Sequence, residues 1–164
     1  FAILIQGFEW KSQVEWYAHY PLALGSAPGE ATFYVTSKRD SSSLLRPGAK
    51  QEAASGVRLD CSVTVRVARL PDVLDVASLP RPILMKLDVQ GAELDVITGA
   101  AEVLPMIDAI YTEVSFVTLY EQQPLASEIT AFLHQHGFAL RGVYNHFFSA
   151  GIGPTQADFL YVKA

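Results

Sequence analysis

The chain has 164 residues, which is the length of one ordinary domain. Half of the residues are hydrophobic and 18% are charged, a composition that predicts a buried core and argues against intrinsic disorder. Twelve Lys and Arg residues against 17 Asp and Glu residues give a net charge of −5. Because the basic residues do not cluster, we expect no nucleic-acid partner.

The single cysteine and the short apolar runs indicate the compartment. Cys61 has no second cysteine with which to form an internal disulfide, which fits a reducing environment. No apolar stretch reaches the roughly 20 residues of a bilayer span. The apolar run at residues 1–5 is too short, and lacks the basic flank, for a signal peptide. We therefore expect a cytoplasmic protein without a membrane span. Because the chain begins inside an apolar run, we also expect one N-terminally incomplete domain over residues 1–164.

The first half of the chain is rich in strand signals. Residues 1–5 are continuously apolar, which is typical of a parallel strand that is buried on both faces. A short strand and a turn are predicted within residues 21–29, and a strand over residues 30–36, where β-formers are frequent. The polar segment 37–56 predicts a surface loop. Residues 57–67 alternate in the manner of a strand.

The second half of the chain alternates strands with helices. Apolar residues recur with helical spacing between Val96 and Leu104, and Pro105 and Gly137 are typical helix-ending residues. This alternation indicates an α/β fold with a mostly parallel sheet, closed by a final pair of strands without a clear helix between them. The predicted strands cover residues 83–89, 109–116, 138–144 and 158–162, and the predicted helices cover residues 92–104 and 126–136.

Three acidic residues fall near the carboxyl ends of predicted strands, where ligands bind in open α/β sheets. They are Glu9, Asp88 and Glu113. Each one alone is equally well explained as a helix N-cap or a solvated loop acid, but three together favour a shared cleft. Lys86 lies on the same strand face as Asp88 and is interpreted as its ion-pair partner. Glu93 is placed in the first turn of the next helix, where the helix dipole favours a negative charge.

Other chemistries have little support in the sequence. His134 and His136 project to different sides of a predicted helix, and His19 and His146 are isolated, so no metal site is predicted. The chain has no nucleophile elbow, no P-loop and no glycine-rich dinucleotide motif. A glycosyltransferase would need a metal-binding acid pair of D-x-D type. Two residues after Asp88, where the second acid would stand, the chain has Gln90.

One segment carries a family resemblance. The stretch Ile83-Leu-Met-Lys-Leu-Asp-Val-Gln-Gly-Ala-Glu-Leu-Asp-Val-Ile-Thr-Gly-Ala100 resembles the central motif of the FkbM family of methyltransferases. Glu113-Val-Ser-Phe116 and Leu119-Tyr-Glu-Gln-Gln-Pro-Leu125 continue the similarity downstream. Gly7-Phe8-Glu9 and Ala23-Leu-Gly25 continue it upstream, so the resemblance covers most of the chain.

The resemblance implies a class I, Rossmann-like methyltransferase fold with helices on both faces of a mostly parallel sheet. It implies S-adenosylmethionine as the cofactor, with transfer of its methyl group to a hydroxyl oxygen of a sugar or secondary metabolite. Glu9 resembles the acid that holds the cofactor ribose, Asp88 the acid beside the methyl donor, and Glu113 an acid on the substrate side. Leu24, within Ala23-Leu-Gly25, joins Glu9 and Asp88 as an expected cofactor-binding residue.

The chain also departs from the family pattern. The family's first strand and glycine-rich loop are absent, so we expect a sheet with a gap between the strands that precede Glu9 and Asp88. Asp88, Glu113 and His146 are the candidates for the residue that removes the acceptor proton. The acceptor, a small molecule or a glycan, is expected to contact residues 41–45, 119–124 and 144–151. The alternative is a non-catalytic remnant of the scaffold that acts as an interaction domain.

Overall fold

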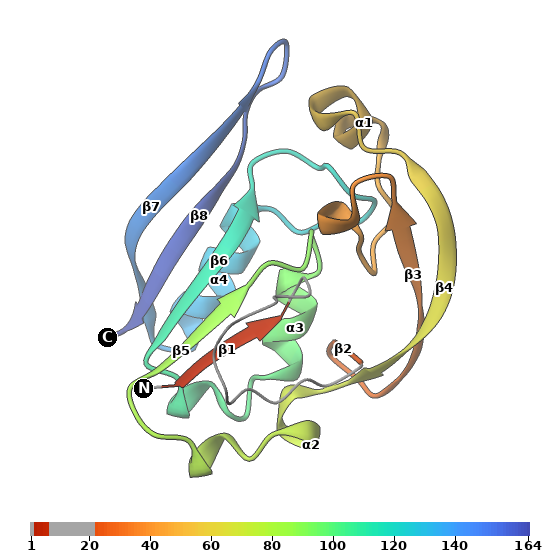
Figure 1. Cartoon of the computed structure of the whole chain (residues 1–164). Helices are drawn as coiled ribbons and strands as arrows, with labels where there is room; N and C mark the ends of the chain where they lie inside the picture. The colour runs from red at the N-terminus through yellow and green to blue at the C-terminus, as the bar shows by residue number, and fades with distance from the viewer. Residues whose placement is uncertain (1, 7–21) are drawn as a thin grey trace, which may run out of the picture.

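The computed structural model describes residues 2–6 and 22–164, and these form two sheets (Figure 1). The larger sheet has the strand order β1-β5-β6-β8-β7, and the smaller has the order β2-β4-β3. The strands of the larger sheet are β1 (Ala2–Gln6), β5 (Ile83–Leu87), β6 (Ala109–Ser115), β7 (Phe138–Ser149) and β8 (Gly153–Lys163). Those of the smaller sheet are β2 (Ala23–Leu24), β3 (Gly29–Thr36) and β4 (Leu59–Ala68).

Helices connect the strands and cover one face of the larger sheet. The α-helices are α1 (Ala49–Ser55), α2 (Leu70–Val73), α3 (Glu93–Gly99) and α4 (Ala126–Gln135), and the 3-10 helices are η1 (Arg39–Ser41), η2 (Val76–Ser78) and η3 (Leu104–Met106). Side chains of α3 and α4 share one core cluster with the buried side chains of β5 and β6. None of the helices in the described part of the chain is long and apolar enough to span a bilayer.

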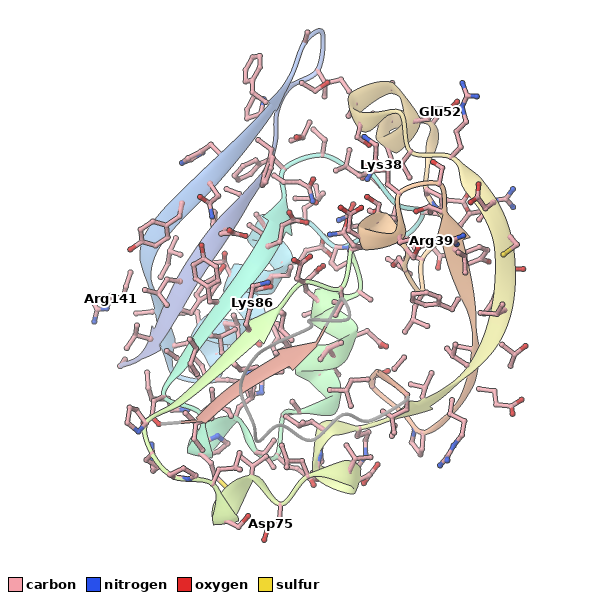
Figure 2. All side chains as sticks on the ribbon, in the orientation of Figure 1. Lys38, Arg39, Glu52, Asp75, Lys86 and Arg141 are labelled. Carbon is pink, nitrogen blue, oxygen red and sulfur yellow. The ribbon has the colours of Figure 1, made fainter. Side chains whose placement is uncertain are left out.

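The larger sheet has one apolar face and one polar face. On β5, Ile83, Met85 and Leu87 are almost fully buried, while the side chain of the intervening Lys86 is 36% exposed. Because successive side chains of a strand point to opposite faces, this alternation places the core on the helix side. The other face carries Lys86 near its centre (Figure 2), together with polar side chains of β6 and β8.

The smaller sheet contributes little to the core. Its longest strand, β4, is exposed at nearly every position from residue 59 to residue 66. The smaller sheet is fixed to α3 by a close backbone approach, because a Cβ atom at Gly99 would lie 2.0 Å from the carbonyl oxygen of Gly25. The amide of Ser26 also donates to Oδ2 of Asp95 at 3.2 Å.

The expected class I fold, with a mostly parallel sheet and helices on both faces, is wrong for this structure. Only β1–β5 and β5–β6 of the larger sheet are parallel, whereas β6–β8 and β7–β8 are antiparallel. The smaller sheet is mixed as well. The physical reason is that the βαβ alternation holds only from β5 to α4. Before that unit β3 pairs antiparallel with β4, and after it β8 pairs antiparallel with β6 and β7. Antiparallel contacts of this kind need no crossover helix.

The expected gap in the larger sheet is closed. β1 pairs directly and in parallel with β5, from Ala2 opposite Ile83 to Gln6 opposite Leu87. Two element boundaries also differ from the sequence expectation. The helix expected over residues 92–104 ends at Gly99 and is followed by η3, and the loop expected over residues 37–56 contains η1 and α1.

Candidate functional site

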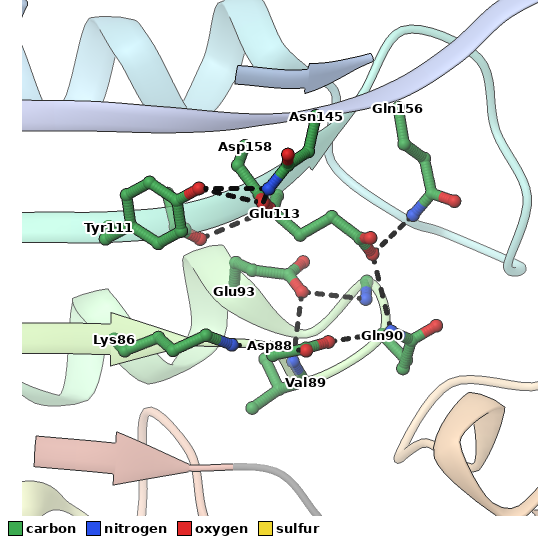
Figure 3. A network of polar contacts seen from close by, with 12 residues as sticks. Lys86, Asp88, Val89, Gln90, Glu93, Tyr111, Glu113, Asn145, Gln156 and Asp158 are labelled. Carbon is green, nitrogen blue, oxygen red and sulfur yellow. Dashed lines mark hydrogen bonds and ion pairs between the residues drawn. The ribbon is translucent and has the colours of Figure 1, made fainter. Parts of the chain in front are cut away.

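Two acids meet at the carboxyl ends of β5 and β6. Asp88 follows β5 directly and Glu113 lies on β6, and the side-chain amide of Gln90 connects them (Figure 3). Nε2 of Gln90 donates to Oδ1 of Asp88 at 2.8 Å and to Oε2 of Glu113 at 3.3 Å. Nε2 of Gln156, on β8, donates to the same Oε2 of Glu113. Three neighbouring strands therefore supply one polar cluster.

The loop between β5 and α3 is held by a buried carboxyl group. Oε1 of Glu93 accepts hydrogen bonds from the amides of Val89 at 3.3 Å and Gly91 at 3.1 Å. Burial is the main cause that raises the pKa of Glu93 to about 7. Gly91 has a φ of 99° and Gln90 a φ of 53°, so this short loop passes through left-handed backbone at two consecutive residues.

The segment after β3 packs against this loop. The hydroxyl of Ser43 donates to the backbone carbonyl of Gln90 at 2.8 Å. The buried hydroxyl of Tyr120 lies 2.9 Å from Oε1 of Gln90 and accepts from Nε2 of Gln51, on α1, at 3.2 Å. Because these contacts occupy both the backbone and the side chain of Gln90, its amide nitrogen is aimed at the two acids.

A cavity of about 380 Å³ lies beside the cluster. Its walls come from η1, α1, the loop after β5, and the β7–β8 hairpin. The segments expected to contact the acceptor each contribute to it, through Ser41, Leu119 and residues 147–149. The lining residues are Asp40, Ser41, Gln51, Ala54, Ser55, Asp88, Gln90, Glu113, Leu119, Phe147, Phe148, Ser149, Thr155 and Gln156. A larger and more open cavity, of about 510 Å³, lies against α4, and none of the candidate acids lines it.

The two acids differ in their electrostatic surroundings. Burial, and then the charges of Asp88 and Glu93, raise the pKa of Glu113 to about 8. Asp88 is more open, with 44% of its side chain exposed, and its Oδ2 lies 3.2 Å from Nζ of Lys86. The interpretation of Lys86 as the ion-pair partner of Asp88 is confirmed.

Comparison with known proteins decides the family. The family model described as "Methyltransferase FkbM domain" matches residues 8–140. The chain belongs to this family. The "2-O-methyltransferase NoeI" of Sinorhizobium fredii (strain NBRC 101917 / NGR234) is 41% identical over 83 residues, which are 51% of this chain and 34% of that protein. The match thus covers about a third of the relative's length. No solved structure matches the chain.

This FkbM domain brings together some of the expected site residues and separates others. Asp88 and Glu113 line the same cavity. His146 is exposed on β7 and does not line it. Leu24 is half-buried on β2 and packs against the core cluster, also outside the cavity lining. Glu9 lies outside the described residues. Within those residues, no group of three or more His, Cys, Asp or Glu side chains has the arrangement of a metal site.

A second polar cluster lies next to the first on the same face of the sheet. The Tyr111 hydroxyl donates to Oδ2 of Asp158 at 3.0 Å, and Nδ2 of Asn145 donates to the same oxygen at 2.6 Å. Burial and Asp158 raise the pKa of Tyr111 to about 12. Asn145 stands in a β-bulge with a φ of 46°, and such bulges re-aim the side chains that follow them. Phe147 is the next residue of β7 to resume pairing.

Several residues of this candidate site were not predicted from the sequence. Gln90 was considered only as a departure from an acid pair, although it connects Asp88 with Glu113. Gln156 and Gln51 are amides far away in sequence, and no spacing rule selects them. Tyr120 lies in a stretch that resembles the family, which is the one signal that pointed toward it.

Proposed function

We propose that the chain is part of an S-adenosylmethionine-dependent methyltransferase that acts on a hydroxyl oxygen of a sugar or secondary metabolite. The observation that carries the proposal is the convergence of Asp88 and Glu113 on Gln90 at the edge of the cavity. Family membership supports methyl transfer. The name of the relative, a 2-O-methyltransferase, supports oxygen as the atom that is methylated.

The residues at the cavity fit a cationic methyl donor. S-adenosylmethionine, when bound, supplies a methyl group on a positively charged sulfur. Among the described residues, three carboxyl groups line the cavity, those of Asp40, Asp88 and Glu113, and no Lys or Arg does. Carboxylates stabilise a nearby cation, so we propose that Asp88 faces the donor. Glu9 and Leu24 remain proposed cofactor-binding residues.

Glu113 is suited to remove the proton of the acceptor hydroxyl. Its Oε2 accepts from two amides, and its Oε1 has no hydrogen bond with any described residue. A pKa of about 8 is close to the value at which a general base works best near neutral pH. In this reading the acceptor O–H bond would break and its proton would move to Oε1. The acceptor oxygen would bond to the methyl carbon as that carbon's bond to the donor sulfur breaks, with the electron pair staying on the sulfur. Asp88 and His146 are the other candidates for this base.

Binding of S-adenosylhomocysteine tests the proposal directly. Isothermal titration should show saturable one-to-one binding, and incubation with methyl-labelled S-adenosylmethionine should label hydroxyl-bearing acceptors from a panel of glycosides and polyketides. A protein that binds no S-adenosylhomocysteine and labels no acceptor would contradict the proposal and favour the non-catalytic interaction domain.

Substitutions of Glu113 and Asp88 should affect turnover and cofactor binding differently. Glu113→Gln keeps the shape and removes the base, so we expect turnover to fall by about 10²–10⁴-fold with unchanged S-adenosylhomocysteine affinity. Asp88→Asn should lower turnover as well, but should also weaken binding of the cationic S-adenosylmethionine more than that of the neutral-sulfur product. Both variants should melt within a few degrees of the parent protein.

Normal turnover in Glu113→Gln would remove Glu113 from this role. In that case a loss of turnover in His146→Ala would move the base to His146. A large fall in melting temperature for Asp88→Asn would instead make Asp88 a structural partner of Lys86.

A further inference from the structure

The Tyr120 hydroxyl has one more acceptor beside it than it has protons to donate. Tyr120 is fully buried, and its hydroxyl accepts from Nε2 of Gln51 at 3.2 Å. The backbone carbonyl oxygen of Ser41 and Oε1 of Gln90 each lie 2.9 Å from it. Because a phenol has a single O–H, it can donate to only one of these two oxygens at a time.

The side-chain amide of Gln90 decides which oxygen receives this proton. In the structure its Nε2 faces Asp88 and Glu113, and its Oε1 faces Tyr120 (Figure 3). This orientation suits two ionised acids, because carboxylate oxygens can only accept hydrogen bonds. With Oε1 turned to Tyr120, the hydroxyl donates to Gln90 and not to Ser41.

The opposite orientation of the amide suits a protonated Glu113. A half-turn about the soft terminal torsion of Gln90 exchanges its nitrogen and oxygen with almost no change of shape. Oε1 would then accept a proton carried on Oε2 of Glu113, and Nε2 would donate to Tyr120. The Tyr120 hydroxyl would turn to Ser41. Asp88 would lose a donor, but its side chain is 44% exposed and remains paired with Lys86, so water can replace that donor.

Glu113 changes its charge in an accessible pH range. Burial, and then neighbouring negative charges, raise its pKa to about 8. Both orientations of the amide are therefore open to the protein between neutral and mildly alkaline pH. The charged and titratable groups that act on Glu113 or Tyr120 are Lys86 on β5, Asp88 directly after it, Glu93 on α3, Asp158 on β8 and Asp40 on η1.

We propose that Glu113, Gln90 and Tyr120 form a two-state hydrogen-bond switch. When Glu113 is ionised, Gln90 donates to it and Tyr120 donates to Gln90. When Glu113 is protonated on Oε2, it donates to Gln90, Gln90 donates to Tyr120, and Tyr120 donates to Ser41. No covalent bond of the chain changes apart from the O–H bond of Glu113, whose proton exchanges with solvent. The switch joins β6 to η1 across the cavity.

The switch would link acceptor binding to the charge of Glu113, an inference that rests on the proposed function. Ser41 lines the cavity, and in the ionised state its carbonyl oxygen has no proton from Tyr120. An acceptor hydroxyl that donates to this oxygen would therefore favour the ionised form of Glu113. By thermodynamic reciprocity, ionised Glu113 would favour acceptor binding to the same extent.

Nuclear magnetic resonance of the free protein tests the switch without any cofactor or acceptor. The probes are ¹³C labels at the ring carbon that carries the tyrosine hydroxyl and at the glutamate carboxyl carbon. Tyr120→Phe and Glu113→Gln assign the two signals by removing them. The Tyr120 signal should shift with the same midpoint as the Glu113 signal, near pH 8. This readout is independent of methyl transfer, so an inactive protein would refute the proposed function and leave the switch to be decided by the titration.

Two amide replacements separate the switch from a direct electrostatic effect. Gln90→Met removes the linking amide, so the Tyr120 signal should no longer follow the titration of Glu113. Gln156→Met is the matched control, because it removes the other amide that donates to Oε2 of Glu113 and leaves Gln90 in place. In this control both midpoints should rise together, since the charged form of Glu113 loses a donor.

A second buried tyrosine serves as the internal reference. Tyr161 is fully buried and its hydroxyl lies 2.7 Å from that of Thr130, so its signal should stay constant in every variant that is folded. A Tyr120 signal that does not change while Glu113 titrates would overturn the proposal. A Tyr120 shift that persists in Gln90→Met would overturn it as well, because the charge of Glu113 would then act on Tyr120 without the amide.

Discussion

The two sheets of this protein divide the work of stability and of site formation. The larger sheet supplies the core: β5, β6 and β8 share one buried cluster with α3 and α4. The smaller sheet contributes only the partly buried Leu24 to that cluster, yet the segment between β3 and β4 supplies Ser41 and Gln51 to the cavity wall. A region can therefore be nearly dispensable for the core and still be necessary for the shape of a binding site.

The largest expected difference between the sheets is in thermodynamic stability. Ile110, on β6, is fully buried, whereas Val63, on β4, is 47% exposed. We expect Ile110→Ala to lower the free energy of unfolding by about 2–5 kcal/mol, and Val63→Ala to lower it by less than about 0.5 kcal/mol. Urea denaturation followed by circular dichroism measures both.

Equal losses in Ile110→Ala and Val63→Ala would break the comparison. They would mean that the smaller sheet unfolds together with the larger one as a single cooperative unit whose packing is shared.

A second difference is in pH sensitivity, which we expect to lie in the larger sheet. Burial raises the folded-state pKa of Glu93 to about 7 from an ordinary value of 4.5, so the folded protein holds this proton more tightly than the unfolded chain. Its contribution is therefore fully present below pH 4.5 and is lost as pH rises toward 7. The loss is on the order of 3 kcal/mol.

Glu93→Gln should flatten this slope. The amide oxygen of Gln can still accept from Val89 and Gly91, and it has no proton to lose. Guanidinium denaturation at pH 5 and pH 8 should show a smaller difference for Glu93→Gln than for the parent protein, with the residual slope coming from Glu113, whose pKa is also raised. An unchanged slope would place the pH dependence elsewhere.

The smallest expected effect concerns the cavity wall that the β7–β8 hairpin forms. Phe148 is 76% exposed and lines the cavity, whereas Leu140 is 40% exposed on the same strand and does not. If Phe148 covers the bound acceptor, Phe148→Ala should raise the acceptor KM about threefold to tenfold, the range for one aromatic contact. Leu140→Ala should leave KM unchanged. The same KM in both variants would remove the hairpin tip from the acceptor site.

The sequence predicted those elements whose signal lies within a short window, and it did not predict the contacts between residues far apart in the chain. The strands that begin at Ile83 and Ala109, and the helix that begins at Ala126, follow a periodicity visible within one short window, and the structure confirms them. The pairing of β3 with β4 depends on partners separated by residues 37–58, and local alternation does not reveal whether such strands pair in parallel or antiparallel.

The residues of the candidate site also divide into those that the sequence predicted and those that it did not. Asp88 and Glu113 were expected to meet because both lie near strand ends, and this rule depends only on topology. Gln90, Gln51 and Gln156 were missed, because an amide has no spacing signature and its role arises only when distant elements meet. His146 sits in the bulge of β7, where alternation no longer predicts the direction of a side chain.

The left-handed backbone of Gln90 has a consequence for engineering. A residue with a side chain is strained at a φ of 53°, so Gln90→Gly should relax the loop and make the protein harder to melt. The same replacement removes the amide between Asp88 and Glu113. A library screened only for thermal tolerance would therefore enrich glycine at this position and collect robust but inactive variants. At position 90, selection for thermal stability would therefore act against selection for turnover.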